Sequence, residues 1–107
     1  MSDLSRRSCE PCQGDTPPLG DERLRELSAQ VPEWEVVEGH HLQRGFRFGN
    51  FREALAFVNR VGEVAEHEGH HPDVTLGWGY ADIRVFTHVI DGLSENDFVL
   101  AAKVDTL

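Results

Sequence analysis

The chain has 107 residues, which is enough for one domain with a single hydrophobic core. Nineteen Asp and Glu against ten Lys and Arg give a formal charge of −9, which argues against a nucleic-acid or anionic-membrane partner. No apolar run is long enough for a membrane span or a signal peptide, and two cysteines do not make a disulfide framework. We therefore expect a cytoplasmic protein.

The first twenty residues are rich in Ser, Pro, Gly and charged residues and show no hydrophobic periodicity. This composition predicts that 1–20 form a flexible N-terminal arm, followed by a single domain over 21–107. The arm contains Cys9-Glu10-Pro11-Cys12, which is half of a zinc knuckle. No second cysteine pair completes the knuckle, and the βαβ context of a thioredoxin-like motif is missing, so we expect neither a metal nor an obligatory redox role.

The next elements are a short helix and a strand pair. Residues 21–30 have apolar residues at helical spacing and acidic residues in the first turn, where the helix dipole favours them. Residues 34–38 and 42–48 predict two strands around a turn at Gly39-His40. We expect His40 and His41 to be solvated.

The longest helical pattern covers residues 51–68, whose apolar residues recur at spacings of three and four. Gly69 suits the left-handed conformation that ends a helix. Pro72 disfavours a helical conformation at the residue before it, so the chain becomes extended there. The side chains gathered at this helix end are Glu66, His67, Glu68, His70 and His71.

A second hairpin follows the histidines. Residues 73–78 and 81–86 alternate apolar and polar side chains, which predicts two strands joined at Gly79-Tyr80. That register places His71 opposite His88 on the polar face of the hairpin. A slip of one residue would remove this juxtaposition, because it moves every side chain to the other face.

The last segment predicts a helix that begins after Ser94. Ser94 is a good N-cap, and Asp97 stands at the third helical position, as in a capping box. Leu93 and Phe98 occupy the positions of a hydrophobic staple. The element order is then α-ββ-α-ββ-α, which predicts an α+β fold, a four-stranded antiparallel sheet with three helices packed on one face.

The cluster of histidines and glutamates has three possible explanations. A histidine pair in a loop of an acidic protein is often only surface. Histidine and glutamate side chains also bind transition metals. The third explanation is acid–base chemistry, because imidazole titrates near neutral pH and a carboxylate beside it can orient or charge it.

The spacing of these residues resembles the pterin-4a-carbinolamine dehydratase signature. Glu66 is followed after three residues by His70-His71-Pro72, then by Trp78 after five residues, His88 after nine and Asp97 after eight. The resemblance covers residues 19–107, and the Cys9-x2-Cys12 pair is similar to bacterial members of the family. Further positions that carry it are Trp34, Phe46, Phe48, Phe51, Ala54, Phe57, Gly92, Leu93 and Ser94.

This resemblance implies a dehydratase that converts 4a-hydroxytetrahydrobiopterin, a pterin 4a-carbinolamine, to quinonoid dihydrobiopterin and water. The substrate would come from a pterin-dependent aromatic amino acid hydroxylase. The resemblance implies no cofactor and no metal, and it points to a homodimer or homotetramer. It implies His70, His71 and His88 as catalytic residues. The residues that it implies for substrate binding or support are Glu66, Pro72, Trp78, Thr87 and Asp97.

Some of these residues also fit a purely structural role. Trp34 and Trp78 fit positions in the apolar core, and Asp97 fits a simple capping role. Pro72 fits a role in shaping the loop. His67 lies outside the signature and is expected to be solvated.

Two other functions remain open from the sequence. The cluster could form a His/Glu metal site, although adjacent residues on an extended chain point apart, which argues against His70 and His71 sharing one ion. The fold could instead serve as a non-catalytic dimerisation or binding module, as animal relatives do for a homeodomain transcription factor. Retention of all three signature histidines favours catalysis.

Overall fold

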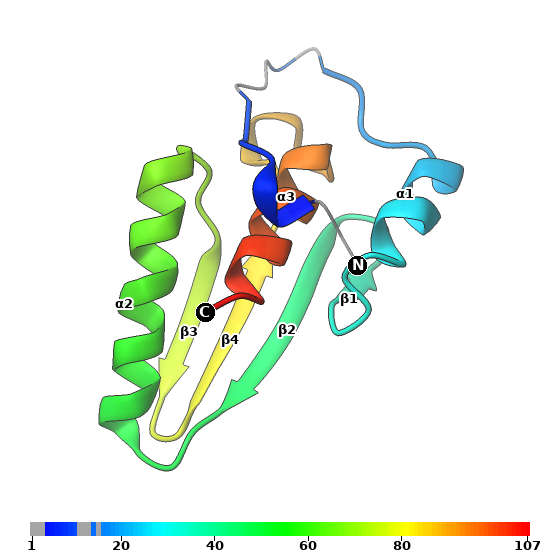
Figure 1. Ribbon diagram of the computed structural model, residues 1–107. Helices are drawn as coiled ribbons and strands as arrows, with labels where there is room; N and C mark the ends of the chain where they lie inside the picture. The colour runs from blue at the N-terminus through cyan, green and yellow to red at the C-terminus, as the bar shows by residue number, and fades with distance from the viewer. Residues whose placement is uncertain (1–3, 11–13, 15) are drawn as a thin grey trace.

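The structure, a computed structural model, describes residues 4–10, 14 and 16–107. It confirms the predicted α+β class, with three helices and four antiparallel strands in the order α-ββ-α-ββ-α. In Figure 1, α2 and α3 lie against the sheet, whose strand order is β1-β2-β4-β3. The elements are α1 (Asp21–Ser28), β1 (Glu35–Val37), β2 (His41–Arg47), α2 (Phe51–Glu68), β3 (Asp73–Gly77), β4 (Tyr80–Val85) and α3 (Glu95–Val104), with short 3₁₀ turns η1 (Leu4–Arg6) and η2 (His88–Ile90).

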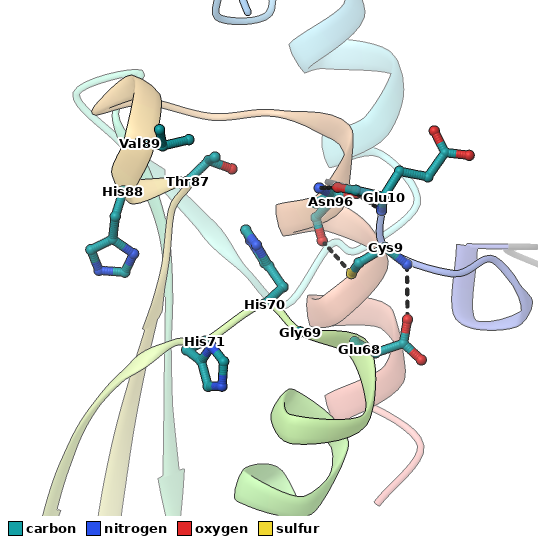
Figure 2. A pocket seen from close by; sticks show the side chains of 10 residues that line it. All are labelled: Cys9, Glu10, Glu68, Gly69, His70, His71, Thr87, His88, Val89 and Asn96. Atoms are coloured by element: carbon teal, nitrogen blue, oxygen red, sulfur yellow. Dashed lines mark hydrogen bonds between the residues drawn. The ribbon is translucent and has the colours of Figure 1, made fainter. Parts of the chain in front are cut away.

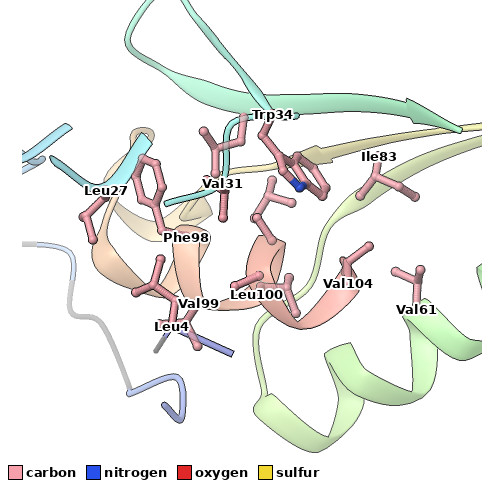
Figure 3. Packing of buried hydrophobic residues seen from close by; sticks show 14 of the residues in the cluster. Leu4, Leu27, Val31, Trp34, Val61, Ile83, Phe98, Val99, Leu100 and Val104 are labelled. Carbon is pink, nitrogen blue, oxygen red and sulfur yellow. The ribbon is translucent and has the colours of Figure 1, made fainter. Parts of the chain in front are cut away.

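The hydrophobic core lies between the sheet and the helices. Ala81, Ile83 and Val85 of β4 are buried, while Arg84 between them is exposed, as the two-residue repeat of a half-buried strand requires. Helix α3 is buried on nearly every side, because it contacts η1, α1, α2 and the sheet. Figure 3 shows its side chains meeting those of the other elements. Buried residues of this cluster include Leu4, Leu27, Val31, Trp34, Val61, Phe98, Val99, Leu100 and Val104.

One arginine lies on the apolar face of the first hairpin. Arg44 pairs with Ile83 across β2 and β4, and its guanidinium lies 4.5 Å from the ring centroid of Phe46. Arg44 Nη1 also donates to Asp105 Oδ1 at 2.6 Å, and the same oxygen accepts from Trp34 Nε1 at 2.8 Å. The charge is therefore accommodated at the edge of the core by a carboxylate and an aromatic ring. Trp34, at 3% exposure, is a core residue.

The predicted register of the second hairpin is wrong by two residues. The turn lies at Trp78-Gly79, and Gly77 pairs with Tyr80. Gly79 takes the left-handed conformation of the turn, with a φ of 78°. At Gly77, an added Cβ would lie 2.2 Å from Cε1 of Tyr80, so only glycine lets that ring cross the neighbouring strand. The two glycines therefore determine where the chain turns.

The corrected register changes two expectations about the site. A shift of two residues keeps the apolar face intact, but it moves Trp78 to the tip of the hairpin, where the residue is 72% exposed. Trp78 is therefore not a core residue. His88 lies on η2 beyond the end of β4, so His71 and His88 are not cross-strand partners.

The segment predicted as a flexible arm contributes to the packing where it is described. Leu4 in η1 is 2% exposed and belongs to the core cluster. The Leu19 N–H donates to the Leu93 carbonyl at 3.1 Å. Cys12 lies outside the described residues, and the domain boundary after residue 20 remains a prediction. Within the described ranges, no helix is long and apolar enough to cross a membrane.

Helix α2 begins and ends where its capping residues predict. The Asn50 side chain accepts from the Glu53 N–H at 2.8 Å. Gly69 ends the helix in the left-handed conformation, with a φ of 67°. The backbone N–H groups of Gly69 and His70 both donate hydrogen bonds to the Ala65 carbonyl, which fixes the direction in which the chain leaves the helix.

We predict opposite effects for two glycine substitutions with open space around the added methyl group. Gly69→Ala should lower the free energy of unfolding by about 1 kcal/mol, because alanine is strained in the left-handed conformation. Gly62→Ala, at an exposed position inside α2, should raise it by about 0.5–1 kcal/mol. Urea denaturation of both variants measures the difference. A neutral Gly69→Ala would show that the cap does not fix the helix end.

Candidate active site

The site is built around one buried carboxylate. Asp97 in the first turn of α3 has no solvent exposure. Its Oδ2 accepts from the Ser94 N–H at 2.8 Å and from Thr87 Oγ1 at 2.9 Å, and its Oδ1 lies 2.5 Å from His70 Nε2. Ser94 and Asp97 form the predicted capping box. Asp97 therefore joins the start of α3, the loop after β4 and the loop after α2.

His70 and His71 point in different directions, as expected for neighbours on an extended chain. His70 is nearly buried, with 11% of its side chain exposed, and is held by Asp97. His71 is 57% exposed, and its Nε2 pairs with Glu66 Oε2 on the last turn of α2. Pro72 is half-buried between these histidines and β3.

His88 is held from both sides. Its Nε2 lies 3.4 Å from Asp73 Oδ1, and its ring lies 4.2 Å from that of Phe86, centroid to centroid. His88 begins η2, and the residue before it, Thr87, is 3% exposed and donates a hydrogen bond to Asp97, which fixes the start of this 3₁₀ turn. Neither Asp73 nor Phe86 was identified as a site residue from the sequence, because both depend on where η2 folds back over β3.

Each of the three signature histidines therefore has its own carboxylate partner. The pairs are His70 with Asp97, His71 with Glu66 and His88 with Asp73. Only the first pair is buried. Among the described residues, no three His, Cys, Asp or Glu side chains are arranged to hold a metal ion. That part of the chain thus gives no support to the metal-site explanation of the cluster.

His40 and His41 are not simply solvated, as their place near a turn had suggested. His40 Nε2 lies 2.7 Å from Asp91 Oδ1, and its ring lies 4.7 Å from Phe86, on which His88 also packs. The two imidazoles share a contact of 3.1 Å between their Nδ1 atoms. Burial lowers the pKa of His41, and the charge of Arg84 adds to the effect. The sheet register brings this turn beside the site, and sequence spacing does not reveal it.

The three histidines line one cavity of ≈ 380 Å³, which falls in the usual size range of small-molecule sites. Figure 2 shows His71 and His88 on one side of it and the N-terminal segment on the other. Glu66 and Asp97 hold histidines without lining the cavity, and Trp78 lies at the far end of the β3–β4 hairpin. The lining residues are Cys9, Glu10, Glu68, Gly69, His70, His71, Thr87, His88, Val89 and Asn96.

An α+β domain with three imidazole–carboxylate pairs around one cavity defines a class of small enzyme-like domains suited to proton transfer. Comparison with known proteins narrows the class. The chain belongs to the pterin 4 alpha carbinolamine dehydratase family, whose sequence model matches residues 17–107.

The relatives agree with this assignment. A protein of Rubrobacter xylanophilus with the provisional name pterin-4-alpha-carbinolamine dehydratase is 64% identical over all 107 residues, covering 100% of both chains. A protein of Alkaliphilus metalliredigens with the same provisional name is 52% identical over 106 residues, covering 98% of this chain and 96% of its own.

Two solved structures share the fold. A transcriptional coactivator/pterin dehydratase from Brucella melitensis has a TM-score of 0.78 at 26% identity, covering 84% of this chain and 97% of its own. A pterin dehydratase-like protein described as a RuBisCO assembly factor in the alpha-carboxysome has a TM-score of 0.56 at 24% identity, covering 68% and 83%. The second likeness concerns the fold alone.

We predict that Asp97 and Glu66 differ strongly in their contribution to stability. Asp97→Ala should lower the free energy of unfolding by about 1.5–3 kcal/mol, because it leaves the Ser94 N–H, the Thr87 hydroxyl and His70 Nε2 without the carboxylate that they contact. Glu66→Gln, at an exposed pair, should change it by less than about 0.5 kcal/mol. Denaturant titration of the two variants tests this, and equal losses would contradict the central role of Asp97.

A second carboxylate beside the cavity, Glu68, makes the stability of the fold depend on pH. The Cys9 N–H, which donates to Glu68 Oε1 at 2.8 Å, lowers the pKa of Glu68 below its ordinary value of 4.5, and the nearby Lys103 adds to the effect. A carboxylate whose pKa is lower in the folded state stabilises the fold above the unfolded pKa. That contribution disappears as the pH falls through the folded pKa.

We therefore predict that Glu68→Gln is less stable than the wild type at pH 7 and that the difference shrinks as the pH falls below 4.5. Urea midpoints measured across this range give the result. Glu63→Gln, at an exposed position of the same helix, is the matched control and should follow the wild type throughout. A difference that is unchanged at low pH would show that the charge of Glu68 is not responsible.

Proposed function

We propose that this protein dehydrates 4a-hydroxytetrahydrobiopterin to quinonoid dihydrobiopterin and water. The observation that carries the proposal is the set of three histidines, each with its own carboxylate, around one cavity in a member of this family. The relatives' names refer to the same class of reaction. The proposal includes a cytoplasmic location, no cofactor or metal, and a pterin-dependent aromatic amino acid hydroxylase as the source of the substrate.

The reaction needs two proton transfers and little else. A general acid protonates the hydroxyl oxygen on C4a while the N5 lone pair forms the N5–C4a double bond, so that the C4a–O bond breaks and water leaves. A general base then removes the proton from N5. Each well-placed proton transfer contributes a factor of about 10²–10⁴ in rate.

The burial of the three pairs supports a division of labour among the histidines. His71 and His88 are both more than half exposed, so a substrate in the cavity can reach their rings. We infer that these two exchange protons with the substrate. His70, whose Nε2 is engaged by Asp97, holds the floor of the cavity and offers its other ring nitrogen to the pterin.

We predict that His71→Ala and His88→Ala each slow the enzyme-dependent dehydration by roughly tenfold or more. Neither residue is on the buried face, so the far-UV circular dichroism should be unchanged. Stopped-flow assay with carbinolamine generated by a hydroxylase measures the rate. His67→Ala, 84% exposed and outside the cavity, is the control. The proposal is wrong if His67→Ala is as slow as His71→Ala, or if both site variants keep the full rate.

We also propose that the protein assembles into a homodimer or homotetramer. Strands β1 and β3 are open edges of the sheet, and such edges pair readily with another chain. Phe51 and Leu55 on α2 and Val74 on β3 are exposed apolar side chains near that β3 edge. Light scattering at micromolar concentration should give a mass of at least two chains. A species of 12.0 kDa would contradict the assembly.

A further inference from the structure

One wall of the cavity lies outside the region that the family model matches. The family model begins at residue 17, but Cys9 and Glu10 line the cavity together with the histidines. Figure 2 shows these two residues across the cavity from His88, on a segment that crosses the start of α3. The segment precedes the region that the family model matches, although the bacterial relatives align over it as well.

Side chains of α2 and α3 hold the backbone of this segment. Glu68, with 6% of its side chain exposed, accepts from the Cys9 N–H. Asn96 accepts from the Glu10 N–H through Oδ1 at 2.8 Å and donates through Nδ2 to the Glu10 carbonyl, as a neighbouring strand would. Because these contacts are to main-chain atoms, they fix the path of the segment whatever its side chains are.

Further anchors lie on the side away from the cavity. Lys103 Nζ donates to the Ser5 carbonyl at 2.9 Å, and Arg7 pairs with Glu95 at 3.0 Å. Leu4 inserts into the core. The nearly buried side chains of Glu68 and Asn96 need their partners on the segment, so the segment is held in one position rather than resting on the surface.

The held segment presents one side chain to the cavity. The Cys9 side chain is directed toward the side on which His70 lies, and its Sγ is 3.6 Å from the Asn96 carbonyl oxygen. Glu10 extends away from the histidines in the same view. Sulfur is polarisable and packs well against the edge or face of an aromatic ring.

We propose that Cys9 and Glu10, held in place by the anchors of residues 4–7, form the wall of the pterin site opposite His88, and that Cys9 is a positioning residue that holds the ring system toward His71 and His88. The inference rests on the proposed function, since it takes a pterin as the occupant. Proton transfer requires the reacting atoms of the substrate to lie within hydrogen-bond reach of the imidazoles. Without the wall at Cys9, the cavity would be open opposite the histidines, and a flat ligand could bind out of that reach.

The first test adds bulk at Cys9. Cys9→Phe should weaken binding of 7,8-dihydrobiopterin, a stable dihydropterin, by about tenfold or more, which is a loss of about 1.4 kcal/mol. It should raise KM for the carbinolamine more than it lowers kcat. Ser8→Phe places the same ring one residue away, at an exposed position outside this cavity, and should bind within about twofold of the wild type. Wild-type affinity in a folded Cys9→Phe, or equal weakening by Ser8→Phe, would overturn the proposal.

A second measurement covers the case in which Cys9→Phe does not fold. In a Cys12→Ser protein kept under reducing conditions, iodoacetamide modifies Cys9, and saturating 7,8-dihydrobiopterin should slow this modification. The same rate with and without the pterin, in protein that binds it, would overturn the inference. A wild-type protein that does not accelerate carbinolamine dehydration would instead refute the proposed function, so the two failures are distinguishable.

Discussion

The structure depends most on the buried carboxylate of Asp97. A charge removed from water must be fully paired, and Asp97 is paired by groups from three separate segments: Ser94 at the start of α3, Thr87 after β4 and His70 after α2. The same contacts that cap α3 therefore bring the loops bearing His70 and His88 together. A residue that looks like a helix cap in the sequence is also the physical link between the fold and the site.

This arrangement separates a rigid, buried histidine from two histidines that a ligand can reach. His70 is fixed on the buried side by Asp97, whereas His71 and His88 reach the cavity from exposed positions and keep their own carboxylates nearby. A carboxylate beside an imidazole fixes the orientation of the ring, which suits the proton transfers that we propose. The N-terminal segment completes the cavity on the side opposite His88.

The helices and their caps could be predicted from the sequence, because the local sequence signals and the final fold agree. The limits of α2, the Gly69 cap and the Ser94–Asp97 capping box depend only on nearby residues, and they were predicted correctly. The register of the second hairpin was not, because it depends on Tyr80 packing across Gly77. Alternation of side chains is the same for both registers, so periodicity alone cannot distinguish them.

The partners of the histidines were predictable to different degrees. Glu66 lies near His71 in sequence, and the signature includes it. Asp73 becomes the partner of His88 only when η2 folds back toward the start of β3. His40 packs on Phe86 only because β2 pairs with β4, which brings the first turn beside the end of β4. The wall formed by Cys9 and Glu10 has no periodicity to reveal it, because it is held through its main chain.

The central claim is that His71 and His88 exchange protons with one substrate in one cavity and so act together. The most direct test is a double-mutant cycle on His71 and His88 in the stopped-flow dehydration assay. Groups that act together are non-additive, so the double alanine variant should be slowed by clearly less than the product of the two single effects. A double variant slowed by the full product would mean that the two imidazoles act independently, and it would contradict the account.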